Sequence, residues 1–272
     1  MPEGDTIHRT AATLRQALAG QTLTAIESTV PAVAGRLQLT PLVGGRVDAI
    51  EARGKHLLIH LAPPAGGEPL VLHTHMRMTG SWHLYRPGEP WRKPARRARV
   101  VLQTEAFVAV CFNAPVVALL EAAQLRRHPE LARLGPDAAA EGFDLDAAVA
   151  RLRSRPEREI AVALLDQSAL AGVGNVYKSE VLFLAGISPF RPVRTLSDGE
   201  LRALVERCHR LLRLNCAQPI RRTHFALNER ERLWVYGRQG KPCRRCGTPI
   251  RRRLQGEEAR STYYCPRCQG VE

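Results

Sequence analysis

Four cysteines near the end of the chain constrain its fold more than any other feature. They form two Cys-x2-Cys pairs, Cys243 with Cys246 and Cys265 with Cys268, and 18 residues separate the pairs. Four thiolates on two tight turns form the tetrahedral ligand set of a structural zinc ion. Structural disulfides are the alternative. Without a secretory signal, the spacing favours one zinc ion whose four positions are all filled, and therefore a structural metal.

The chain also carries a large excess of positive charge. Its 272 residues include 40 basic and 26 acidic side chains, which gives a net charge of +14. Only four of the basic residues are lysines: Lys55, Lys93, Lys178 and Lys241. Arginine stays charged and grips phosphate with a planar fork, so the excess predicts a polyanionic partner, usually nucleic acid. A basic protein without a nucleic-acid role is the alternative that composition leaves open.

Composition excludes several other classes of protein. Hydrophobic residues make up 44% of the chain, which is enough for an ordinary core and excludes a disordered chain. No apolar run approaches the roughly 18–20 residues of a membrane span, so no membrane association is expected. Residues 1–10 contain two acids and no apolar stretch, and we therefore expect no secretory signal and a cytoplasmic protein.

The first half of the chain is expected to form a β-sandwich with a helix packed against it. Residues 5–19 have helical periodicity between a possible cap, Asp5, and a stop residue, Gly20. Residues 22–112 hold short β-prone runs between turn signals. These runs cover residues 57–61, 70–73, 99–103 and 107–112.

From about residue 119 the pattern becomes helical. Helices are expected at 119–134, 144–153, 157–165, 176–185 and 198–214, the last of them after the capping box Ser197-x-x-Glu200. The tail returns to short β runs around the cysteines. We therefore predict an α+β protein with an N-terminal β-sandwich (1–118), a helical domain (119–221) and a zinc β-hairpin (222–272).

The N-terminus offers a chemical group of its own. Pro2 is small enough to permit removal of Met1, which would expose a secondary amine. A secondary amine must form a charged iminium with a sugar carbon, and that electron sink favours both displacement of a base and elimination of phosphate. Glu3 beside it can move protons. The alternative is that Pro2 only aids processing and Glu3 is a solvated acid, which holds for most chains that begin Met-Pro-Glu.

Four sequence segments, taken in their order along the chain, favour a chemical role for Pro2 and Glu3 over that alternative. With them the chain resembles the formamidopyrimidine-DNA glycosylase/endonuclease VIII family, and within it the endonuclease VIII branch. Each segment alone is moderately specific, and together with the zinc spacing they are very specific. The segments are Met1-Pro2-Glu3-Gly4, Glu51-Ala52-Arg53-Gly54-Lys55, the stretch from Leu164 to Asn175, and the zinc hairpin from Pro242-Cys243 to Cys268-Gln269.

The resemblance implies a bifunctional DNA glycosylase and abasic-site lyase of base-excision repair. Pro2 would be the Schiff-base nucleophile, and Glu3 the proton-transfer residue. Lys55, on a hairpin of the β domain, would bind phosphate at the lesion and act as an acid, and it is grouped with the catalytic residues. A surface cation at a turn is the alternative for Lys55, and the bend residue Gly54 and the rarity of lysine both favour the family role. The partner would be damaged DNA, with no small-molecule cofactor, and the protein would be a monomer that joins the nucleoid while on DNA.

Two further elements of the resemblance concern phosphate contacts. The glycine loop before Asn175 resembles the family's helix–two-turn–helix element, in which glycines and a helix N-terminus approach a phosphate, and Asn175 would be a phosphate ligand. A plain helix–turn–helix corner would fit that loop about as well. Arg260 on the zinc hairpin resembles the family's phosphate-clamping arginine and is grouped with the catalytic residues. The nearby run 251–253 is either a further contact or a solvated face.

The segment 73–80 resembles the loop that fills the gap when a base leaves the helix. Extruding a nucleotide loses stacking worth a few kcal/mol, so an inserted side chain helps. Met78 aligns best with the wedge and Arg77 flanks it, while His75 can contact phosphate. A methionine buried in the core is the alternative for Met78.

The sequence departs from the family in ways that bear on substrate. Thr6 stands where the family usually has a second glutamate, so that carboxylate's role is in doubt. Residues 111–114 lack the Arg-x-Phe pair that the formamidopyrimidine branch uses opposite the lesion, which favours oxidised pyrimidines over 8-oxoguanine as substrates.

Two rival functions remain: a non-catalytic zinc DNA-binding protein and an inert damage-binding paralogue. Joint retention of Pro2, Glu3 and Lys55 argues against both.

Overall fold

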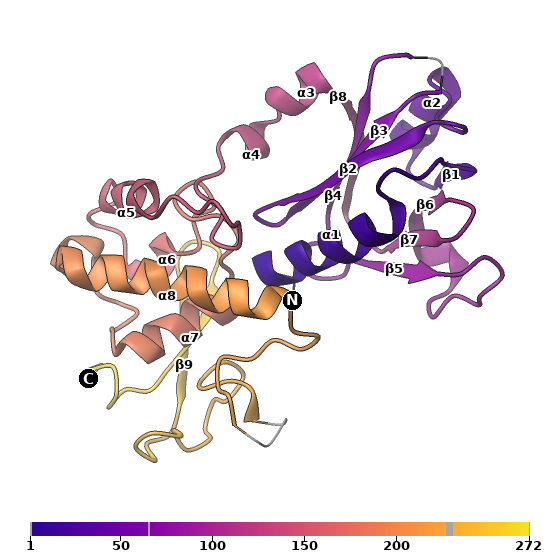
Figure 1. Ribbon diagram of the computed structural model, residues 1–272. Helices are drawn as coiled ribbons and strands as arrows, with labels where there is room; N and C mark the ends of the chain where they lie inside the picture. The colour runs from indigo at the N-terminus through magenta and orange to yellow at the C-terminus, as the bar shows by residue number, and fades with distance from the viewer. Residues whose placement is uncertain (1, 65, 227–230, 272) are drawn as a thin grey trace. The chain divides into compact units, whose positions relative to one another are not determined.

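The computed structural model describes residues 2–64, 66–226 and 231–271 (Figure 1). Contacts divide these residues into two compact units. Pro2 and Thr6–Ala132 form the first, and Glu3–Asp5 with residues 133–271 form the second. Within the described residues, no helix combines the length and the apolar character needed to span a bilayer. The division into domains 1–118, 119–221 and 222–272 stays a prediction.

The first unit contains two antiparallel four-stranded sheets, as the sequence predicts for a β-sandwich (Figure 1). One sheet has the order β2 (Arg46–Arg53), β3 (His56–Ala62), β4 (Leu70–His75), β8 (Val116–Glu121). The other has the order β1 (Ala25–Ser28), β6 (Ala98–Gln103), β7 (Val108–Phe112), β5 (Ser81–Tyr85). A 3-10 turn, η1 (Ala95–Arg97), precedes β6.

Helix α1 (Gly4–Leu18) confirms the predicted N-terminal helix to within a residue. Its apolar side chains recur every three or four positions, and Ile7, Leu14 and Leu18 are buried in one core with residues of both sheets. Burying each such side chain stabilises the fold by about 1.5–3 kcal/mol. A second helix, α2 (Pro31–Leu39), was not predicted; it begins on a proline at its first turn, a position that tolerates the missing N–H.

The predicted helix 119–134 is wrong at its start. Strand β8 continues to Glu121 because its backbone pairs with β4, with Leu119 opposite Leu72. Two short helices follow, α3 (Ala122–Arg126) and α4 (Pro129–Ala132), and the proline at 129 separates them. An apolar run of this length does not distinguish a strand from a helix by periodicity alone.

The described residues of the second unit form four α-helices and a two-stranded hairpin: α5 (Leu145–Arg153), α6 (Ile160–Ala163), α7 (Asn175–Ala185), α8 (Asp198–Cys216), β9 (Arg251–Gln255) and β10 (Arg260–Tyr264). A 3-10 turn, η2 (Val193–Thr195), precedes α8. The capping box is confirmed, because the Glu200 N–H donates to the Ser197 hydroxyl and the Ser197 N–H donates to the Glu200 carboxylate. Helices α7 and α8 pack together around a core that includes Val181, Leu204 and Leu212.

The predicted helix 157–165 is also too long. Only α6 forms there, because the backbone at its start bonds to another segment instead of extending the helix. The N–H groups of Ile160 and Ala161 donate to the carbonyls of Arg191 and Pro189, at 2.8 and 3.2 Å. Apart from these two segments, the helical part and the zinc hairpin follow the sequence, and the α+β class is confirmed.

Candidate active site and metal centre

The carboxylate of Glu3 is fully buried and accepts three backbone hydrogen bonds from the start of α7. Its Oε2 accepts the N–H of Gly174 at 3.0 Å and that of Tyr177 at 3.2 Å, and its Oε1 accepts the N–H of Val176 at 2.8 Å. The first N–H groups of a helix have no partner within the helix and carry its positive dipole end. These three N–H groups therefore hold the carboxylate that follows Pro2 in a fixed position, and we call them the Glu3 seat.

Two glycines make this seat possible. A Cβ on Gly174 would lie 2.5 Å from Cδ of Glu3, so any side chain there would displace the carboxylate. A Cβ on Gly4 would lie 3.0 Å from Cα of Gly172, whose carbonyl accepts the Gly4 N–H at 2.8 Å. We expected these N–H groups to face phosphate; instead, the chain's own Glu3 occupies those of 174, 176 and 177.

A buried ion pair lies beside Glu3. Asp5 is fully buried and binds Arg221 through both carboxylate oxygens, at 2.8 Å from Nε and 2.5 Å from Nη2. The third nitrogen of the guanidinium, Nη1, lies 3.9 Å from Oε1 of Glu3. The guanidinium also stacks over the ring of Tyr177, 5.0 Å from its centroid. The site thus holds a second carboxylate at position 5, next to the threonine that replaces the family's glutamate.

Lys55 lies on a tight two-residue turn of the first unit. Gly54 and Lys55 connect β2 to β3, and Gly54 has a φ of +58°, a left-handed conformation that favours glycine. The predicted hairpin placement of Lys55 is confirmed, while its role stays a prediction.

The loop after β4 presents side chains to solvent. Met78 is 63% exposed, so the alternative of a core methionine is wrong; Met76 fills the core position instead. Arg77 is exposed too and adopts a left-handed backbone with a φ of +42°. The loop is closed by two bonds, from the Gly80 N–H to the Met76 carbonyl and from the Thr79 hydroxyl to the Asn113 carbonyl.

Four histidines gather behind this loop, and sequence reasoning identified only His75 among them. His56 and His73 are buried and lie 2.9 Å apart between Nδ1 and Nε2, and His75 and His128 complete the cluster edge-on. Burial and the neighbouring cations and imidazoles lower the pKa of His56 to about 2 and those of His73 and His75 to about 4. His56, His73 and His75 are therefore neutral at physiological pH.

The other predicted phosphate ligands lie in the second unit. Asn175 is the first residue of α7, and its Oδ1 accepts a bond from Lys178 at 3.1 Å. Arg260 begins β10, is 47% exposed on its side chain, and pairs with Glu258. Arg251, Arg252 and Arg253 are exposed on β9. Their exposure suits both a further phosphate contact and a solvated face. The structure thus places Asn175 and Arg260 in one unit, and Lys55, His75, Arg77 and Met78 in the other.

Glu180 of α7 has a structural role, as its position in the helix indicates. Its buried carboxylate accepts the N–H groups of Trp234, Val235 and Tyr236 at 2.8–2.9 Å and also the hydroxyl of Thr223. It therefore anchors the segment that leads from α8 to the zinc hairpin.

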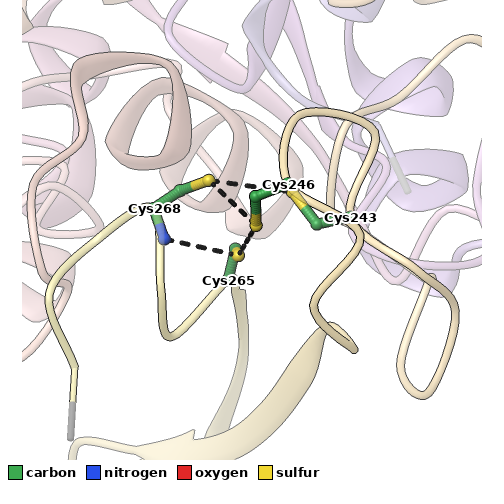
Figure 2. Close-up of side chains that lie close together, drawn as sticks. All are labelled: Cys243, Cys246, Cys265 and Cys268. Atoms are coloured by element: carbon green, nitrogen blue, oxygen red, sulfur yellow. Dashed lines mark hydrogen bonds between the residues drawn. The ribbon is translucent and has the colours of Figure 1, made fainter.

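The four cysteines converge on one point (Figure 2). Their sulfur atoms all lie within 4.8 Å of one another, with 3.9 Å between Cys243 and Cys268, 3.5 Å between Cys246 and Cys265, and 3.4 Å between Cys246 and Cys268. All four are free thiols rather than disulfides. Zn–S bonds of about 2.3 Å in a tetrahedron place sulfurs about 3.8 Å apart, so the set fits one structural zinc ion. The metal holds a hairpin that is too small to fold alone.

Family models match three successive parts of the chain. The N-terminal domain of formamidopyrimidine-DNA glycosylase matches residues 1–115, its H2TH domain matches residues 134–223, and the zinc finger found in FPG and IleRS matches residues 240–271. The chain belongs to the formamidopyrimidine-DNA glycosylase/endonuclease VIII family. The zinc finger model matches the region of the converging cysteines, so the predicted metal and its structural character are confirmed.

Individual members of this family agree along the whole chain. The chain is 42% identical to the probable endonuclease 8 2 of Streptomyces coelicolor, covering 99% of this chain and 94% of that one. It is 40% identical to the DNA-(apurinic or apyrimidinic site) lyase Nei2 of Mycolicibacterium smegmatis, covering 99% of each. A complex of Lactococcus lactis Fpg with DNA containing an abasic site aligns with a TM-score of 0.79 and 27% identity over 98% of this chain and 99% of that one.

Proposed function

We propose that the protein is a bifunctional DNA glycosylase and abasic-site lyase of base-excision repair that acts on oxidised pyrimidines. One observation carries the proposal: the residue after Pro2 is a fully buried carboxylate that accepts three N–H groups at the start of α7. A merely solvated first-turn acid would need no such seat. The secondary amine of Pro2 and the acid beside it are the two groups that Schiff-base chemistry on deoxyribose requires.

The reaction proceeds through a covalent link to the sugar. The Pro2 nitrogen bonds to C1′ while the glycosidic bond breaks, and the base leaves with that electron pair and takes up a proton. The Pro2 nitrogen then gives its N–H proton to Glu3, and Glu3 delivers a proton to O4′. The freed nitrogen electron pair opens the C1′–O4′ bond and leaves a C1′ iminium. Loss of a C2′ proton expels the 3′ phosphate, and a second elimination expels the 5′ phosphate. Water hydrolyses the iminium and frees Pro2, leaving a one-nucleotide gap with phosphate ends.

DNA binding relies on phosphate contacts and on a side chain that fills the space of the extruded nucleotide. Lys55, His75, Asn175 and Arg260 contact phosphates near the lesion, while Met78, flanked by Arg77, fills the space of the extruded nucleotide. The exposure of Met78 and Arg260 suits these roles. Because most contacts are to phosphate, affinity falls steeply with salt. The protein acts as a monomer in the cytoplasm, on the nucleoid while bound to DNA.

The substrate class rests on sequence differences between the branches. Residues 111–114 lack the Arg-x-Phe pair of the formamidopyrimidine branch, and relatives at about 40% identity carry endonuclease 8 names. Excision is measured on duplexes with 5-hydroxycytosine, dihydrouracil, thymine glycol or 8-oxoguanine. The proposal expects the pyrimidine lesions to be removed at least about tenfold faster, a difference of about 1.4 kcal/mol in the barrier. Preference for 8-oxoguanine would contradict it.

The role of Glu3 is tested by Glu3→Gln, with Glu206→Gln as the control because Glu206 is exposed on α8. Base excision is lost in the first variant and unchanged in the second. Unchanged excision by Glu3→Gln shows that the acid is assigned wrongly. DNA binding without excision or covalent trapping in the parent protein favours a non-catalytic binding protein.

A further inference from the structure

Lys178 of α7 is a buried cation that the proposed mechanism does not use. Its side chain is 1% exposed, and its ammonium group contacts three acceptors. The Nζ atom lies 3.1 Å from Oδ1 of Asn175, 3.0 Å from the carbonyl oxygen of Ser261 and 2.8 Å from Oγ1 of Thr262. An ammonium group has three protons, so each has a partner and none is left for a DNA phosphate.

The three acceptors belong to the two elements that carry the proposed phosphate ligands of this unit. Asn175 is one of those ligands and begins α7, one turn before Lys178. Ser261 and Thr262 directly follow Arg260, the other ligand, on β10. Thr262 continues the connection by donating to Gln255 of β9 at 2.8 Å. Lys178 therefore ties the residue that begins the helix to the strand that presents the arginine.

The bond to Asn175 also decides which end of its amide faces away from Lys178. An ammonium can only donate, so it holds the carbonyl oxygen of the amide toward itself, and the NH2 group lies at the opposite end. A phosphate accepts hydrogen bonds from the NH2 group and is repelled by the oxygen. Without the lysine, the amide can rotate and present either end.

Burying the Lys178 ammonium group away from water costs free energy. Burial lowers the pKa of Lys178 to about 7, opposed by the charge of Glu3 and assisted by that of Arg260. An apolar side chain of similar length would fill the same space without that cost, since buried charges are weak evidence for stability. The charge is consistent with a need for a hydrogen-bond donor at this point.

We propose that Lys178 is a positioning residue for phosphate recognition, which holds the Asn175 amide with its NH2 group toward the DNA. This inference rests on the proposed function, because it presumes that Asn175 contacts phosphate. It assigns Lys178 no contact with DNA and no part in the covalent chemistry.

A double-mutant cycle tests the inference on the zinc-loaded full chain, with a duplex oligonucleotide containing a tetrahydrofuran abasic-site analogue. Lys178→Met is expected to raise Kd about tenfold, the value of one phosphate hydrogen bond. In an Asn175→Ala background the same change is expected to raise Kd less than twofold. The rate of borohydride trapping on abasic DNA at saturating concentration stays within about twofold of the parent, because no chemical step is affected. Lys241→Met, an exposed lysine of the same unit, shows no coupling to Asn175.

Equal effects of Lys178→Met with and without Asn175 would overturn the inference, as would no effect at all. A second variant leaves the lysine in place, in case its loss impairs folding. Asn175→Asp keeps the acceptor for Lys178 but turns a second oxygen toward the phosphate, so it is expected to bind DNA more weakly than Asn175→Ala. Binding as tight as that of Asn175→Ala would contradict the amide orientation. If Asn175→Ala itself binds like the parent, the phosphate assignment under the proposed function fails instead.

Discussion

Glu3 and Gly174 lie so close together that no side chain fits between them. The Gly174 N–H donates to the Glu3 carboxylate at 3.0 Å, and a Cβ on Gly174 would lie 2.5 Å from the Glu3 Cδ. The position of the Glu3 carboxylate thus depends on the absence of a side chain 171 residues further along the chain.

Replacing Gly174 with alanine is therefore expected to displace Glu3 and to slow base excision by about 100-fold, because a shift of about 1 Å in a reacting group has that effect. Single-turnover excision measures the loss. Gly199→Ala is the control, since nothing lies within 4 Å of a Cβ there, and it should excise like the parent. Parent-like excision by Gly174→Ala would show that the seat does not control Glu3.

Breaking the buried pair of Asp5 and Arg221 is expected to destabilise the protein strongly. Asp5→Asn removes the carboxylate charge that binds Arg221 most closely, which lowers the free energy of unfolding by about 3–5 kcal/mol. The exposed pair of Asp146 and Arg202 gives the comparison, and Asp146→Asn should change that free energy by less than about 1 kcal/mol. Urea unfolding of both variants measures the difference; equal small losses would mean that the buried pair contributes little.

The histidine cluster predicts a loss of stability in acid. Because the pKa of His73 is about 4 in the folded protein and 6.5 without the fold, the unfolded state takes up the proton first as pH falls. Stability is therefore full above pH 6.5 and declines toward pH 4, by on the order of 3 kcal/mol from this residue. Urea unfolding at pH 7.5, 6, 5 and 4.5 follows the decline. His73→Leu should flatten the curve, whereas His8→Gln, outside the cluster, should leave its slope unchanged; a flat parent curve would contradict the prediction.

Removing zinc is expected to abolish DNA binding before it affects the β-sandwich. Elemental analysis should find one zinc ion per chain, and Cys265→Ser should lose it. Cys216→Ser, which alters a cysteine outside the cluster, should keep it. Chelation followed by DNA titration and circular dichroism tests the order of events. Full binding by the metal-free protein would remove the hairpin from the DNA interface.

Features encoded by short spacings could be predicted from the sequence. The paired cysteines, the capping box at Ser197 and the amphipathic α1 each involve residues a few positions apart, and the structure has them where expected. The errors lie where distant backbone pairing overrides local periodicity, as in β8, which pairs with β4, and at Ile160, which bonds to Arg191.

The candidate site was predictable only in part, for the same reason. Asp5 meets Arg221 across 216 positions, and Lys178 meets Thr262 across 84. No local pattern indicates such partners. His56 and His73 sit 17 positions apart and meet only because β3 and β4 are paired.

The account depends most on a covalent bond between the mature N-terminal nitrogen and C1′ of deoxyribose. Borohydride reduction of the protein with abasic-site DNA, followed by nuclease digestion and peptide mass spectrometry, locates that bond. The account predicts one adduct per chain on the peptide that begins with Pro2, and none in Pro2→Gly chains blocked by N-terminal acetylation. An adduct on Lys55, Lys178 or any other side chain would contradict it.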